Sequence, residues 1–139
     1  MPRPAARGAA GGHETLLLVD DEQLLLEVGR RMLGGASYRV FIAQSGEEAL
    51  EICRRQGRQL NLVILELSMP DVGSHRCLGH ILELTPQARV SVASGYSFEG
   101  MAGQALKVGA ADFVAKPFTR TDLLEAVRRV LDQRQGSRE

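Results

Sequence analysis

The chain has 139 residues, of which 44% are hydrophobic and 24% charged, and its formal net charge is zero. This size and balance suit one globular domain with a real core. Zero net charge without a basic stripe argues against nucleic-acid binding, and no apolar segment has the length of a membrane span or the pattern of a signal peptide. We therefore expect a cytoplasmic domain with no nucleic-acid or membrane partner.

Polar segments flank the expected folded body. Residues 2–12 contain no large apolar side chain and cannot contribute a core face. We expect residues 1–13 to form a disordered leader or linker, residues 14–132 to form the domain, and residues 133–139 to form a polar tail.

Short apolar runs alternate with helical patterns along the body. The runs are apolar on both faces and are bounded by turn residues, as in a parallel sheet that is covered on both sides. They predict strands at 15–19, 39–43, 62–66, 90–93 and 112–115. Five such units predict a doubly wound α/β fold, a five-stranded parallel sheet flanked by five helices.

Apolar residues recur at helical spacing between these strands. The predicted inward faces are, in chain order, Leu24, Val28, Met32 and Leu33; Ala49, Ile52 and Cys53; Cys77, Leu78, Ile81 and Leu82; Met101, Ala105, Leu106 and Val108; and Leu123, Leu124, Val127, Val130 and Leu131. Ser45 and Glu48 predict a capping box at the start of the second helix, and Thr119 predicts the N-cap of the fifth.

The two cysteines, Cys53 and Cys77, fall among the apolar residues of predicted helices. They have no metal-ligand spacing, and no feature supports a disulfide. Buried free thiols in a reducing cytoplasm are therefore expected.

Polar residues follow several of the predicted strands. In open α/β sheets the functional crevice lies beyond the carboxyl ends of the strands. This edge gathers three carboxylates, a hydroxyl and an ammonium group, from Asp20, Asp21, Glu66, Ser94 and Lys116. Three close carboxylates repel one another unless a cation or proton intervenes, and Mg²⁺ prefers oxygen ligands of this kind. The simpler alternative for Asp20 and Asp21 is that they only begin a helix.

Strands that end in Asp20-Asp21 and in Glu66, with a later one that ends in Lys116-Pro117-Phe118, resemble the receiver domain of two-component response regulators. The resemblance covers about residues 14–132. It implies a flavodoxin-like fold and a non-enzymatic role in a phosphorelay. It also implies a histidine kinase or phosphotransfer protein as partner, and a downstream output domain or protein that meets the fourth helix, fifth strand and fifth helix.

The resemblance also implies roles for single residues. In the family, acidic residues and a backbone carbonyl hold Mg²⁺, and the corresponding positions here are Asp20, Asp21, Glu66 and Ser68. Lys116, before a cis peptide bond, would neutralise the phosphoryl group, and Ser94 would donate a hydrogen bond to it. Phe113 matches an aromatic residue that changes rotamer in response. The simpler alternatives are a surface lysine, a turn hydroxyl and a core aromatic.

Glu66 departs from the family, in which the phosphoacceptor is aspartate. Glutamate is longer by one methylene, and a misplacement of about 1 Å costs positioned chemistry roughly 10²-fold. We expect phosphorylation to be impaired, or imitated by a fixed charge at Glu66. In the alternative, Glu66 pairs with Lys116 and locks the domain; an engineered glutamate is a third interpretation. Gly73-Ser74 also replaces the usual loop pair, while His75 and His80 are expected to be exposed helix residues.

Three wider interpretations accompany the resemblance. The Pro/Ala/Arg-rich segment before Thr15 is similar to the linker of a C-terminal receiver in a hybrid histidine kinase. A flavodoxin-like cofactor binder would need a phosphate loop after the first strand, where Asp20, Asp21 and Glu22 repel phosphate. A Mg²⁺-dependent phosphatase-like enzyme would need a substrate-covering insertion, and these loops are short.

Overall fold

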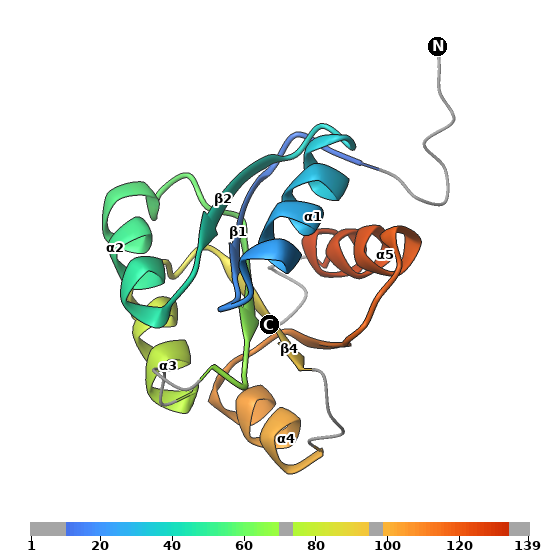
Figure 1. The fold of residues 1–139 in the computed structure, drawn as a ribbon. Helices are drawn as coiled ribbons and strands as arrows, with labels where there is room; N and C mark the ends of the chain where they lie inside the picture. The colour runs from blue at the N-terminus through green and yellow to red at the C-terminus, as the bar shows by residue number, and fades with distance from the viewer. Residues whose placement is uncertain (1–10, 70–73, 95–98, 134–139) are drawn as a thin grey trace.

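The computed structural model describes residues 11–69, 74–94 and 99–133. Strands and helices alternate along this chain (Figure 1). The strands are β1 (Thr15–Val19), β2 (Arg39–Ala43), β3 (Leu62–Glu66), β4 (Arg89–Ser94) and β5 (Asp112–Ala115). The helices are α1 (Gln23–Gly34), α2 (Gly46–Gln56), α3 (Ser74–Leu84), α4 (Glu99–Val108) and α5 (Arg120–Leu131). The predicted fold is confirmed, and β4 is one residue longer at each end than expected.

The sheet is wholly parallel, in the order β2-β1-β3-β4-β5. Helices α1 and α5 cover one face, and α2, α3 and α4 cover the other (Figure 1). Strand order reverses between β1 and β3, which creates a crevice at their carboxyl ends. Asp20 and Glu66 lie at the carboxyl ends of β1 and β3, so the crevice forms at the edge of the sheet where the sequence predicted a site.

Two apolar cores lie on the two faces of the sheet, because neighbouring residues of a strand point to opposite sides. Leu17 belongs to the core under α2 and α3, whereas Leu16 and Leu18 belong to the core under α1 and α5. Cys53 and Cys77 are both buried in the first core, and no disulfide joins them, as expected. Burial raises the pKa of Cys53 to about 11, so this thiol stays protonated at neutral pH.

The buried face of α1 differs from the prediction. Leu26, Gly29 and Leu33 face the sheet, whereas Leu24 and Val28 are exposed. A Cβ at Gly29 would lie 2.7 Å from Leu18 Cδ2, so the helix lies on the sheet through its glycine. The prediction is therefore wrong for Leu24 and Val28 but right for Leu33, which is buried, and for Met32, which packs on the core under α1 and α5.

The other helices follow the prediction more closely, with two exceptions. On α4, Ala105 is buried but Leu106 and Val108 are exposed; the side chain of Met101 lies outside the described part. At the start of α2, Ser45 Oγ accepts from Glu48 N, as in a capping box. The Glu48 carboxylate, however, accepts from Gln44 N and not from Ser45 N, so only half of the capping box forms. The remaining inward residues of α2, α3 and α5 are buried or partly buried: Ala49, Ile52, Cys53, Cys77, Leu78, Ile81, Leu82, Leu123, Leu124, Val127, Val130 and Leu131. Thr119 and Asp122 form a complete box at α5.

Polar side chains gather around Arg128 at the amino-terminal end of the sheet, in what we call the arginine cluster. Arg128 of α5 donates to both carboxylate oxygens of Glu14 at 3.0 and 3.1 Å, to Tyr38 Oη at 3.2 Å and to Asp132 Oδ1 at 2.6 Å. A Cβ on Gly12 would lie 2.2 Å from Glu14 Oε1. A side chain at Gly12 would therefore require the flexible ends of Glu14 and Arg128 to move.

Candidate functional site

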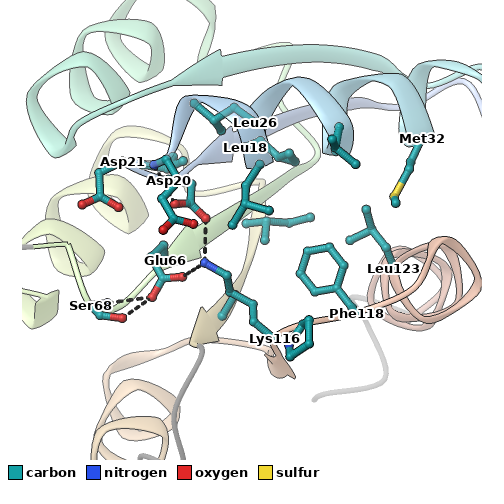
Figure 2. A pocket seen from close by; sticks show the side chains of 18 residues that line it. Leu18, Asp20, Asp21, Leu26, Met32, Glu66, Ser68, Lys116, Phe118 and Leu123 are labelled. Carbon is teal, nitrogen blue, oxygen red and sulfur yellow. Dashed lines mark hydrogen bonds and ion pairs between the residues drawn. The ribbon is translucent and has the colours of Figure 1, made fainter.

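Three charged side chains meet where the strands end (Figure 2). Asp20 directly follows β1, Glu66 ends β3, and Lys116 directly follows β5. These parallel strands end at one edge of the sheet, which is why residues 46 and 50 positions apart in sequence come together. The gathering of Asp20, Glu66 and Lys116 that the sequence predicted is observed.

Lys116 bridges the two acids. Its Nζ lies 2.5 Å from Glu66 Oε1 and 2.9 Å from Asp20 Oδ2. Partial burial alone would lower the pKa of Lys116, but hydrogen bonds and charge from Glu66 and Asp20 outweigh it and raise that pKa. Lys116 is therefore a stable cation, and it partly neutralises an acidic pair that would otherwise repel.

Glu66 is held on its other side by Ser68. Glu66 Oε2 accepts from Ser68 N at 2.9 Å and from Ser68 Oγ at 2.5 Å. Glu66 is only 3% exposed, so these contacts replace the water that its carboxylate has lost. Both oxygens are thus engaged, and the carboxylate is fixed in one orientation. The sequence indicated Ser68 only as a source of a backbone ligand, not as this hydrogen-bond donor.

The acids do not offer a divalent ion the expected set of ligands. Lys116 already contacts Asp20 and Glu66, and Asp20 Oδ1 also accepts from Glu22 N at 3.0 Å. Asp21 is exposed. Across residues 11–69, 74–94 and 99–133, no group of three or more His, Cys, Asp or Glu side chains could hold a metal ion. The residues as placed therefore do not fit Mg²⁺, and weak magnesium binding stays a prediction.

Ser94 and Phe113 occupy different surroundings. Ser94 ends β4 and is buried, and its carbonyl accepts from Lys116 N at 2.8 Å, which ties the lysine backbone to the neighbouring strand. Phe113 is half-buried and packs on the core under α2 and α3. The Lys116-Pro117 bond is cis, as the resemblance implied. Of the predicted loop, Gly73 lies outside the described residues, while His80 is exposed as expected.

A pocket of about 570 Å³ adjoins the charged site. Its apolar wall comes from α1 and α5 and from the segment between β5 and α5, with Met32, Phe118 and Leu123 among the side chains in Figure 2. Asp20, Glu66 and Lys116 form its polar end. The sequence did not reveal this pocket, because its shape depends on which face of α1 packs against the sheet, and the prediction did not place Gly29 on that face.

The comparisons with known proteins agree with this geometry. The model of the response regulator receiver domain family matches residues 16–128. The chain therefore belongs to the response regulator receiver domain family. This result supports the receiver interpretation over the flavodoxin-like cofactor binder. No helix in the described ranges is both long enough and apolar enough to cross a membrane.

Among curated relatives, the chain is 32% identical over 117 residues to Protein CcdB of Bacillus subtilis and covers 96% of it. It is 35% identical to the response regulator protein FleR of Pseudomonas aeruginosa but spans only 26% of that length. It is 30% identical to the sensor kinase CckA of Brucella abortus and spans 13% of it. Receiver sequences of this kind thus occur alone and inside larger proteins.

Two solved structures show the same fold. A CheY-like receiver domain protein from Methanospirillum hungatei is 26% identical, with a TM-score of 0.80 over 87% of this chain and 95% of that one. A chain from the CheX-CheY-BeF3-Mg complex of Borrelia burgdorferi is also 26% identical, with a TM-score of 0.80 over 86% and 90%.

Proposed function

We propose that this domain signals without accepting phosphate, because Glu66 takes the acceptor position and is held by Lys116 and Ser68. The observation that carries the proposal is the 2.5 Å contact between Glu66 Oε1 and Lys116 Nζ. In-line attack on phosphorus needs a nucleophile placed under a cationic clamp, with little tolerance in position. Here the cation already neutralises the carboxylate, and the extra methylene moves that carboxylate toward the space of the phosphoryl group.

Of the two consequences expected for Glu66, the geometry favours the locked pair. A free negative charge would imitate a phosphoryl group, whereas this carboxylate is paired and hydrogen-bonded on both oxygens. No step through a metal ion follows from this arrangement. The paired Glu66, and not a phosphodonor, then determines the signalling state of the domain.

Incubation with a small acyl phosphate and Mg²⁺, followed by intact-mass measurement, tests the proposal. The native chain should gain no phosphoryl group, and Glu66→Asp should gain one. Glu66→Gln is the matched control and should gain none. Labelling of the native chain at Glu66 would refute the proposal, while failure of Glu66→Asp would place the defect in the loop that contains Gly73.

We further propose that the output surface is formed by α4, β5 and α5. Leu106, 47% exposed, and Val108 are exposed apolar side chains on α4, and Asp112 of β5 pairs with Arg129 of α5 at 2.6 Å. Apolar side chains beside fixed charges are suited to binding a protein partner. A histidine kinase or phosphotransfer protein remains the proposed upstream partner.

The match within CckA supports a second proposal, that the domain works as a C-terminal receiver of a hybrid kinase. Co-purification of the kinase core with the native chain, compared with Leu106→Asp, would test whether the α4 surface carries the contact. Equal recovery of both chains would remove α4 from the interface.

A further inference from the structure

Helix α1 presents an apolar ridge to solvent. Leu24 is 75% exposed, Leu25 40% and Val28 41%. Among the described residues, these are three of the six exposed large hydrophobic side chains, and they lie within five positions of one helix. Single exposed leucines are ordinary, but a contiguous apolar group on one helix indicates a surface that another molecule covers.

The charges around this ridge have a defined order. Leu24, Val28 and Arg31 follow one another at spacings of four and three, so they lie on one face of α1, and all three are exposed. Acidic Asp21 and Glu22 stand just before the helix, also exposed. Along its axis the surface therefore reads acid, apolar, apolar, base.

This order is complementary to itself. A two-fold axis uses the same surface on both partners, so that each contact occurs twice. With two α1 helices antiparallel and the axis beside position 26, Leu24 of one copy meets Val28 of the other. The same axis sets Asp21 against the other copy's Arg31. A parallel arrangement would instead place acid against acid and base against base.

The pocket beside α1 suits the same arrangement. Leu25, Val28 and Met32 border it on the α1 side, and Phe118 borders it from the segment before α5. The protruding Leu24 does not line the pocket of its own molecule. Packed against Val28 of a second copy, Leu24 would stand at the mouth of that copy's pocket. The surface thus carries both an apolar projection and an apolar recess, as a self-complementary interface requires.

We infer that the α1 surface formed by Leu24, Leu25, Val28 and Arg31 is a dimer interface between two antiparallel copies of this chain. The inference goes beyond the proposed function and does not depend on it, because the hydrogen bonds and ion pairs that hold Lys116 and Glu66 involve none of these four residues. A second copy is the chosen occupant because the charges of α1 complement themselves.

Sedimentation equilibrium of the full chain, up to about 1 mM, tests the inference. The native chain should show a reversible dimer. Leu24→Asp and Val28→Asp should each raise the dimer Kd at least about tenfold, because each places charge in the apolar centre. Leu106→Asp on α4 is the matched control, with a similarly exposed leucine on another helix, and should leave the Kd unchanged. Circular dichroism should show that all three variants are folded.

A charge exchange tests the antiparallel geometry. Arg31→Glu and Asp21→Lys should each weaken self-association, because each sets like charges together across the axis. An equimolar mixture of these two variants should recover a Kd near the native value as a heterodimer. The inference is overturned by a native chain that is monomeric throughout, by a dimer that Leu106→Asp disrupts and Leu24→Asp does not, or by a mixture that associates no better than its components.

Discussion

Lys116 reaches past the end of β4 to place its ammonium group 2.5 Å from the Glu66 carboxylate, although Glu66 ends β3 and Lys116 follows β5, two strands that do not pair. β4 lies between β3 and β5, and the Ser94 carbonyl at its end fixes Lys116 N at 2.8 Å. The lysine backbone is therefore positioned by one neighbour and its side chain by the next. The ion pair between Lys116 and Glu66 is therefore positioned by the backbone of the sheet, unlike an ion pair between two exposed side chains.

The first prediction concerns the loss of this cation. Lys116→Met should lower the free energy of unfolding by about 3 kcal/mol, because it leaves a buried carboxylate without its counter-charge. Urea denaturation measures the change. Arg30→Met is the control: Arg30 pairs with Glu27 on the exposed side of α1, and its loss should cost less than about 1 kcal/mol.

A double variant separates the ion pair from the packing of the lysine stem. Lys116→Met combined with Glu66→Gln should be more stable than Lys116→Met alone, since the buried residue 66 is then uncharged and only the Asp20 carboxylate has lost its lysine. Equal stability of the single and double variants would mean that Glu66 does not depend on Lys116 for its charge.

The second prediction concerns magnesium. The native chain should bind Mg²⁺ weakly, because Lys116 occupies the position between Asp20 and Glu66. Lys116→Met should bind at least about tenfold more tightly, which corresponds to about 1.4 kcal/mol of relieved repulsion. Amide NMR shifts of Asp21 and Ser68 during titration report the binding. Equal affinity of both chains would contradict the prediction.

The third prediction is a pH dependence at the other end of the sheet. Partial burial raises the pKa of Glu14, but hydrogen bonds and charge from Arg128 outweigh it, and the pKa falls below its ordinary value of 4.5. A carboxylate with a lowered folded-state pKa stabilises the fold above its unfolded pKa, and this stability is lost as pH falls through the folded value. The free energy of unfolding should therefore decline below about pH 4.5.

Glu14→Gln tests which group is responsible. This variant should be less stable than the native chain at pH 7, and the difference should shrink as pH falls below 4.5. Arg128, His13, Tyr38 and Asp132 also face this cluster, and Arg128→Met should reproduce the loss. Glu47→Gln, at an exposed position of α2, is the control. A constant difference between Glu14→Gln and the native chain across this range would disprove the assignment.

The fourth prediction concerns the start of α5. Thr119 Oγ1 accepts from Asp122 N at 3.0 Å, and the Asp122 carboxylate accepts from Thr119 N at 3.0 Å. Thr119→Ala should lower the free energy of unfolding by about 1 kcal/mol. Thr119→Ser keeps the acceptor and should restore most of it. A thermal denaturation series would contradict the cap if alanine and serine behaved alike.

Sequence reasoning succeeded where a pattern has one physical solution. The run Leu62–Glu66 is apolar on both sides up to its last residue, which is typical of a covered strand. Parallel strands end at one edge of a sheet, which brought Glu66 to Lys116. Helix α1 has apolar residues on two sides, so spacing could not choose between Leu24 and Leu26. In the structure Leu26 is buried, because the face of α1 that carries Gly29 packs closely against the sheet.

Site details failed for a related reason. The hydrogen bond from Ser68 Oγ to Glu66 Oε2 depends on the path of the chain after β3. The apolar periodicity of the sequence carries no information on that path. The sequence placed three acids near one another, but it could not show that Lys116 would contact Asp20 and leave Asp21 exposed. Such pairings follow from side-chain geometry at the level of single ångströms.

The arginine cluster gives α5 a mechanical consequence. The helix begins three residues after Pro117, beside the charged site, and near its other end Arg128 holds Glu14 at the point where the chain enters the domain. At about 1.5 Å per residue, α5 spans roughly 18 Å. One helix therefore connects the two ends of the sheet, and a tilt of α5 that follows a shift at Lys116 would also displace Arg128 relative to Glu14.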